Sequence, residues 1–162
     1  MTAPDITIRA SRPSDVPRLA ELVVEAFEGI TLHHLRERRY GRIGGRSWQE
    51  WKSGELVSFA ERHPDQILVA EVDGRVVAFC AYQLDRERKI GAIGNNGVDR
   101  TFRNRGIATR LCARALEVFR DEGMIAAEVT TGLDEGHAAA RRTYEKVGFE
   151  PLMRTVRYVR DL

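Results

Sequence analysis

A chain of 162 residues is long enough for one domain, which would bury roughly 70% of the surface that the unfolded chain exposes. Its 26 basic and 24 acidic residues leave a net charge of only +2, which argues against general affinity for nucleic acids or anionic membranes. No signal peptide is apparent at the start, and no apolar stretch approaches the roughly 20 residues that span a bilayer. Cys80 and Cys112 lie among apolar residues, which favours reduced core thiols. We therefore expect a cytoplasmic protein.

The first third of the chain is expected to form one strand and two helices. Residues 6–9 alternate between apolar and polar side chains, as a short strand does. Ser14 or Asp15 can cap a first helix, and Ser47 can cap a second one. The apolar residues at helical spacing are Val16, Leu19, Ala20, Val23 and Phe27 in the first, and Trp48, Trp51, Leu56 and Phe59 in the second. Five arginines and three glycines within residues 33–46 predict a solvated loop or short helical turns.

The remainder alternates between strands and helices. Residues 66–72 and 75–84 are predicted strands joined by Asp73-Gly74, a strong signal for a two-residue hairpin. In residues 89–98, three glycines indicate a bulge or the close approach of a ligand. The elements expected after this run are a helix over 107–122, a strand over 125–131, a helix over 137–147 and a closing strand over 153–159. Without repeats or linkers, the pattern predicts one α/β domain with a mixed sheet.

The most informative stretch is residues 98–109, in which a strand ends, a basic turn follows and a helix begins. Free backbone N–H groups at a helix N-terminus attract anions. Gly106 allows a ligand to approach the backbone, while Arg103 and Arg105 can offer paired donors to phosphate oxygens. The chain has no Gly-Lys-Ser/Thr and no Gly-x-Gly-x-x-Gly, which argues against a nucleotide P-loop and a dinucleotide site.

Two motifs resemble those of the Gcn5-related N-acetyltransferase (GNAT) family. The run Arg103-x-x-Gly106-x-Ala108 resembles its coenzyme A pyrophosphate loop, and residues 140–149 resemble its late helix, Ala-x-x-x-Tyr-x-x-x-Gly-Phe. The resemblance implies the acyl-CoA N-acyltransferase fold, an α/β fold with a mixed, mostly antiparallel central sheet and flanking helices. It implies that residues 1–162 form a single N-acetyltransferase domain, with a sheet that splays open beside the loop.

The resemblance also implies acetyl-CoA as co-substrate, no metal, and a set of contacts. Tyr144 is implied near the coenzyme sulfur, where it can protonate the departing thiolate; a phenol of pKa ~10 and a thiol of ~8.5 differ little. His137 stands where many members carry an asparagine, and it either contacts the coenzyme arm or only begins the helix. The backbone of Val98 and Arg100 should pair with the pantetheine amides. The implied cofactor-binding residues are Val98, Asp99, Arg100, Arg103, Asn104, Arg105, Gly106, Ile107, Ala108, Thr109, His137 and Tyr144.

The general base is not specified by the sequence. A free alkyl amine is protonated at neutral pH and must lose a proton before it can attack a thioester. Many relatives place a glutamate on the strand before the loop, but this chain has Asn95 and Asn96, which cannot accept a proton. Glu128, on the following strand, is the expected catalytic base. The other candidates are Glu25, Glu28, His33, His34 and Tyr40.

The residues and the resemblance together predict an acetyl-CoA-dependent N-acetyltransferase. It is expected to transfer the acetyl group to a primary amine of a small molecule by direct attack in a ternary complex. The acceptor is expected between residues 27–51 and 153–158. Two alternatives stay open: a protein lysine or N-terminal acetyltransferase, and a non-catalytic acyl-CoA-binding regulatory module. Neither a nucleic acid nor a membrane is an expected partner, and the sequence leaves a homodimer open.

Overall fold

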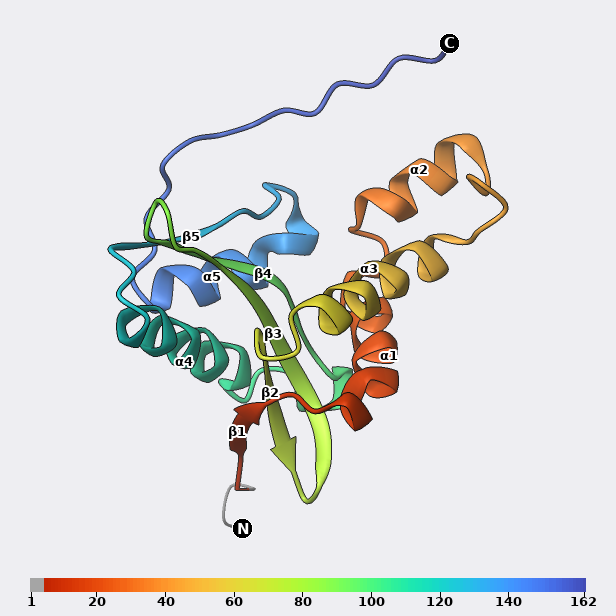
Figure 1. Cartoon of the computed structure of the whole chain (residues 1–162). Coiled ribbons are helices and arrows are strands. Elements are labelled where there is room, and N and C mark those ends of the chain that lie inside the picture. The colour runs from red at the N-terminus through yellow and green to blue at the C-terminus, as the bar shows by residue number, and fades with distance from the viewer. Residues whose placement is uncertain (1–4) are drawn as a thin grey trace.

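The computed structural model describes residues 5–162, so the expectation about a leader segment falls largely on residues outside the described part. Its centre is a five-stranded sheet in the order β1-β2-β3-β4-β5 (Figure 1). The strands are β1 (Thr7–Ala10), β2 (Ile67–Val72), β3 (Arg75–Asp85), β4 (Ile90–Val98) and β5 (Ala126–Val129). Neighbours from β1 to β4 pair antiparallel, whereas β4 and β5 pair parallel. The mixed, mostly antiparallel sheet confirms the predicted fold class.

Helices cover both faces of this sheet (Figure 1). One face packs against α1 (Val16–Phe27) and α3 (Trp48–Arg62) through a core that includes Leu22, Leu56 and Phe79. The other face packs against α4 (Ile107–Asp121) and α5 (Ala138–Lys146) through a second core. Cys80 and Cys112 are free and buried in this second core, as predicted. No helix within residues 5–162 is long and apolar enough to cross a membrane.

Two segments differ from the sequence-based expectation. The arginine-rich region forms a helix, α2 (Leu32–Tyr40), because Thr31 caps it by accepting the N–H of His33. The Glu37 carboxylate then accepts the N–H of Trp48 and ties α2 to the start of α3. The predicted closing strand over 153–159 is wrong: residues 149–162 have no regular secondary structure and are mostly exposed. A strand forms only against a pairing partner, and this segment pairs with no strand of residues 5–162.

The remaining elements match the predictions to within a few residues. Ser47 caps α3 in a capping box with Glu50, as its sequence position indicates. Asp15 does not cap α1 with its side chain, because its carboxylate instead accepts the Arg12 N–H and two hydrogen bonds from Arg9. Asp73 and Gly74 form the predicted two-residue hairpin, both with positive φ.

Strand β4 decides where the site lies. Its register against β3 shifts between Cys80↔Asn96 and Tyr82↔Ile93, so two residues of β4, Gly94 and Asn95, lie opposite one of β3. Its pairing with β5 ends at Ile93↔Val129, and the two strands separate beyond that point. The bulge and the split lie together at the middle of the sheet, between the two helical layers.

Candidate active site

A large cleft of about 1350 Å³ opens where β4 and β5 separate. Segments from both helical layers line it: the end of α1, one face of α3, β4, the loop before α4, the end of β5, and α5. This volume exceeds the roughly 300–1,000 Å³ of a typical small-ligand pocket, which suits two substrates held side by side.

The loop before α4 presents a row of free backbone donors to this cleft. The first helical hydrogen bond runs from the N–H of Arg110 to the carbonyl of Gly106. Within residues 5–162, the N–H groups of residues 103–109 have no acceptor. Asn104 and Gly106 both have positive φ, which curves the backbone into a concave anion-binding nest. A Cβ added at Gly106 would meet no atom within 4 Å, so the space in front of the nest is open.

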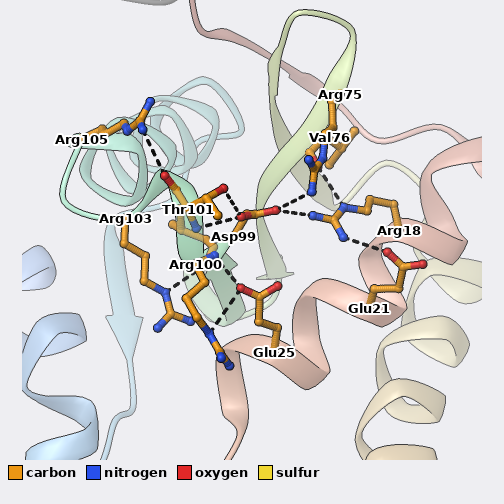
Figure 2. Close-up of polar contacts among 11 residues, drawn as sticks. Arg18, Glu21, Glu25, Arg75, Val76, Asp99, Arg100, Thr101, Arg103 and Arg105 are labelled. Atoms are coloured by element: carbon orange, nitrogen blue, oxygen red, sulfur yellow. Dashed lines mark hydrogen bonds and ion pairs between the residues drawn. The ribbon is translucent and has the colours of Figure 1, made fainter.

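Asp99 holds this loop in place from behind (Figure 2). It is only 4% exposed, and its carboxylate accepts hydrogen bonds from Arg18 at 2.5 Å, from Arg75 at 2.8 Å and from the N–H and hydroxyl of Thr101. Burial raises the pKa of this carboxyl, but the Thr101 bonds and the two guanidinium groups more than offset burial, and the net effect is a lowered pKa. Asp99 is therefore a structural anchor and not a cleft-lining contact, in contrast to its expected role.

The other residues expected at the coenzyme divide between the cleft and the surface. Val98, Arg103, Asn104, Gly106, Ile107, Ala108, Thr109, His137 and Tyr144 line the cleft. Arg100 and Arg105 do not. The Arg100 N–H donates to Glu25 at 2.5 Å, and Arg105 lies over the Phe102 ring and donates to the Thr101 carbonyl (Figure 2). The Val98 carbonyl accepts a bond from Arg103, so one backbone group of each residue expected to pair with pantetheine already has a protein partner.

Tyr144 lies on the α5 side of the cleft and is 7% exposed. Its hydroxyl oxygen accepts a hydrogen bond of 2.9 Å from the Asn96 amide, which leaves the hydroxyl hydrogen free to donate. Burial raises the pKa of Tyr144 to about 12, although the Asn96 bond lowers it. The phenol is therefore neutral at physiological pH, and while its oxygen accepts from Asn96 its hydroxyl can donate a hydrogen bond or a proton.

Asn95 points to the opposite face of the sheet, the α3 side, because successive side chains of a strand alternate between its two faces. Its side-chain oxygen accepts a 2.9 Å bond from Lys52, which is buried and packs 4.3 Å from the centre of the Phe27 ring. Burial lowers the pKa of Lys52, although Glu55 raises it. Glu55 in turn contacts His33, with 2.6 Å between Oε1 and Nε2. Asn95 and Glu55 line the cleft, whereas Lys52 and His33 support them from outside it.

The candidate bases differ in whether they line the cleft and in the partners they contact. Glu25 and Glu28 both contact Arg100 outside the cleft, and Tyr40 contacts Asp161. His34 accepts the Gly29 N–H, and His33 is engaged with Glu55. The carboxylates that line the cleft are Glu50, Glu55 and Glu128. Glu50 is held by Ser47 and Glu55 by His33, whereas Glu128 is exposed and has no hydrogen-bond partner among the residues that the structure describes.

His137 begins the last helical segment and also lines the cleft. Its Nδ1 atom lies 2.7 Å from the Asp134 carboxylate, which orients the ring and leaves Nε2 without a partner among the described residues. Burial raises the pKa of Asp134, but the bond to His137 helps to bring it below its ordinary value. Both roles that the sequence left open, helix start and cleft contact, are compatible with this position.

Sequence reasoning missed Glu55 and Lys52. Trp51, Glu55, Ser58 and Arg62 follow one another at helical spacing, and this face of α3 lines the cleft. Because Trp51 was already expected near the acceptor, the i+4 rule could have added Glu55. Lys52 had no such signal, since a lysine in an amphipathic helix is normally exposed.

Comparisons with known proteins now define the class. A family profile described as Acetyltransferase (GNAT) family matches residues 19–149. The chain therefore belongs to the GNAT family of N-acetyltransferases. It is 28% identical over 149 residues to an uncharacterized N-acetyltransferase of Methanocaldococcus jannaschii, which covers 89% of this chain; the chain spans only 60% of that relative.

Solved structures share the fold at lower identity. The aminoglycoside N-acetyltransferase AAC(6')-Iy, in complex with the bisubstrate analogue CoA-S-monomethyl-acetylneamine, superposes with a TM-score of 0.64 at 16% identity, over 98% of this chain and 99% of that one. A GNAT family acetyltransferase from Brucella melitensis, in complex with acetyl-CoA, has a TM-score of 0.65 at 21% identity, over 92% and 85% of the two chains. At these identities the likeness establishes the fold.

Proposed function

We propose that the protein transfers an acetyl group from acetyl-CoA to the primary amine of a small molecule, by direct attack while both substrates occupy the cleft. The observation that carries the proposal is that the cleft has two chemically different ends. One end is the row of free N–H groups at residues 103–109, and the other is the carboxylate-lined wall of α3 and β5. Related structures hold CoA or acetyl-CoA in this fold, which supports the assignment of the first end.

The described residues fit the coenzyme. The nest at residues 103–109 offers uncharged donors at a helix N-terminus, which suits a pyrophosphate. Arg103, Arg142 and Lys146 line the same part of the cleft and add positive charge. When bound, acetyl-CoA supplies an activated acyl thioester. Val98 and Arg100 would have to exchange their present partners, Arg103 and Glu25, for the pantetheine arm.

Tyr144 stabilises the departing sulfur in this mechanism. With its pKa raised to about 12, the phenol is a weaker acid than a thiol of pKa ~8.5 and holds its proton more firmly than an exposed tyrosine would. The hydroxyl contributes a directed hydrogen bond to the developing thiolate, while Asn96 holds its oxygen in position.

Glu128 is the proposed base. Its carboxylate has no competing partner among residues 5–162, and it lies on β5 directly opposite Ala92, one position before the strands separate. Val129 packs toward the α4 core, so the alternation of a strand directs Glu128 to the α3 side, where the amine would enter. Glu55, held by His33, adds negative charge that favours a cationic amine.

The first experiment measures release of free CoA from acetyl-CoA across amines, polyamines, aminoglycosides, amino acids and short peptides. The native chain and Tyr144→Phe are compared with each acceptor. We expect turnover with a small amine and a loss of about 10²–10⁴ in kcat in the variant, with unchanged affinity for CoA. Because the phenol stays protonated to about pH 12, its contribution should not decline between pH 7 and 10.

The other possible results of the acceptor panel distinguish the remaining hypotheses. Turnover with peptides alone would replace the small amine by a protein acceptor. Tight CoA binding without turnover by any acceptor, together with slow thioester hydrolysis, would favour the non-catalytic module. Failure to bind acetyl-CoA would contradict the proposal as a whole. Thermal unfolding of Tyr144→Phe controls for a fold defect, because Phe keeps the edge-on contact with Phe149.

A further inference from the structure

A buried lysine supports the acceptor end of the cleft from behind. The chain has only three lysines among its 26 basic residues, and one of them, Lys52, is 7% exposed. Its ammonium lies 2.9 Å from the side-chain oxygen of Asn95, 3.5 Å from a carboxylate oxygen of Glu55 and 4.3 Å from the centre of the Phe27 ring. An ammonium has three N–H donors. Each of them has a partner within the protein, so Lys52 has no donor left for a ligand.

The contact with Lys52 fixes the orientation of the Asn95 amide. An ammonium can donate but cannot accept a hydrogen bond, so only the amide oxygen can face Lys52. The Nδ2 atom of Asn95 then points away from Lys52, and no residue within 5–162 accepts its two N–H groups. No buried side-chain nitrogen or oxygen in this part of the chain lacks a partner, so Nδ2 is accessible from the cleft that Asn95 lines. Asn95 therefore presents an amide donor whose orientation is fixed before a substrate arrives.

The neighbouring groups define what Asn95 can recognise. Glu50, Glu55 and Glu128 line the same cleft and offer acceptors to an ammonium group. With its oxygen held by Lys52, Asn95 offers N–H donors, which need an oxygen that can accept. That oxygen should be neutral, because Glu55 contacts the same ammonium as Asn95, and a substrate carboxylate at Asn95 would lie beside the Glu55 carboxylate. The acceptor end therefore combines recognition of a cation with recognition of a hydroxyl or ether oxygen.

We propose that Asn95, positioned by Lys52, is a specificity-determining residue that selects acceptor amines carrying a hydroxyl or ether oxygen. This inference rests on the proposed function and names its class of acceptor. A polyamine has only donors to offer at Asn95, so its binding leaves the amide N–H groups without a partner on the ligand. A site that bonds a substrate oxygen discriminates against the analogue that lacks it. Lys52 acts through Asn95 and is a positioning residue.

The test compares amines that differ by one oxygen. Methoxyalkylamines with two to five carbons between nitrogen and oxygen are each matched with the alkylamine in which a methylene replaces the oxygen. An ether oxygen accepts but cannot donate, so it reports the amide donor alone. We expect kcat/KM with acetyl-CoA to be about 10-fold higher for at least one ether than for its alkyl counterpart, the effect of about one hydrogen bond. Equal values in every pair would overturn the inference and leave acetyl transfer itself intact.

Three variants assign the preference to the proposed contact. Asn95→Asp keeps an oxygen for Lys52 but replaces the donor by an acceptor, so the ether preference should vanish and 1,4-diaminobutane should improve as a substrate. Lys52→Met keeps most of the side-chain length but removes the donor to Asn95, so the amide can rotate and the preference should fall about threefold. Lys89→Met, in the exposed turn between β3 and β4, is the matched control and should retain the full preference.

The ratio within each pair is the readout that a purely structural role of Lys52 would not change. If Lys52→Met lost kcat/KM by the same factor for the ether and its alkyl counterpart, the positioning role would be overturned. Circular dichroism and thermal unfolding check that each variant is folded. Asn95→Asp, which keeps the Lys52 contact, still decides the inference if Lys52→Met does not fold.

A binding measurement separates this inference from the proposed function. Calorimetry of the CoA-loaded chain with the same pairs measures the ether preference as a ratio of affinities. An ether preference in binding without acetylation of any amine would support the role of Asn95 and contradict the proposed function alone. Equal affinities within every pair would overturn the role of Asn95, whatever the chain acetylates.

Discussion

The two ends of the cleft are built in different ways. The proposed coenzyme end is made of backbone: seven consecutive residues, 103–109, have N–H groups without an acceptor among residues 5–162 because a strand, a turn and a helix follow one another in the chain. The proposed acceptor end is made of side chains, including Glu50 and Glu55 from α3 and Glu128 from β5, which the fold brings together from distant parts of the chain. A local motif therefore specifies the first end, whereas the second end can change its acceptor by side-chain substitution without disturbing the loop.

Of the two ends, the acceptor end is expected to show the larger effect. Glu128→Gln should lower kcat by about 10²-fold and remove the acidic limb of its pH profile, because the amide cannot take a proton. Glu55→Gln should instead raise the acceptor KM several-fold and leave kcat nearly unchanged. Steady-state kinetics at saturating acetyl-CoA separates these outcomes.

Glu87→Gln, in the exposed turn between β3 and β4, is the control for a change of charge alone. A loss of kcat in Glu55→Gln equal to that expected for Glu128→Gln would move the base to α3. It would also make His33, 2.6 Å from Glu55, part of the proton path.

A smaller effect, on stability, is expected where the loop is anchored. Asp99→Asn should lower the free energy of unfolding by about 2–3 kcal/mol, because Arg18 and Arg75 lose a buried anionic partner. The pKa of Asp99 is lowered in the folded state, so its stabilisation is present above the ordinary value of about 3.9 and is lost as pH falls below it. Urea titrations of the native chain and of Asp99→Asn at pH 7 and pH 3 measure the two unfolding free energies.

The difference in unfolding free energy between the native chain and Asp99→Asn should be smaller at pH 3 than at pH 7. Asp73→Asn serves as the control, since Asp73 is exposed and asparagine also suits its positive φ and the hairpin turn. A difference that stays constant with pH would mean that Asp99 acts through packing and not through its charge.

The smallest effect is expected at the coenzyme end. Gly106→Ala should weaken CoA binding about 10-fold, because the methyl group enters the space in front of the nest and strains a φ of +74°. Gly74→Ala has the same strain, at a φ of +75°, and the same open surroundings at the far hairpin. Calorimetry with CoA should detect a change in the first variant alone. Equal losses in both would show that strain, and not the nest, sets the affinity.

The sequence by itself determined most of the fold and the coenzyme end of the site. The order of strands and helices follows from local periodicity, and the residues of the loop from 103 to 109 are neighbours in the chain, so that their resemblance to the GNAT pyrophosphate loop could be recognised. Tyr144 could be located for the same reason, since its helix motif is continuous. Helix α2 was missed because its stability comes from the Thr31 cap and the contact of Glu37 with α3, and not from an apolar face.

Only the tertiary structure decided the rest. Strand alternation places Asn95 and Asn96 on opposite faces, and only the fold shows that one meets Lys52 and the other Tyr144. The bulge beside them is a one-residue shift of register, which leaves no mark in composition. Asp99 lies within the motif but is buried behind it, because Arg18 and Arg75 converge on it from segments about 80 and 24 residues away. Whether residues 153–159 form a strand depends on an edge to pair with, and a pairing partner is not a property of the segment itself.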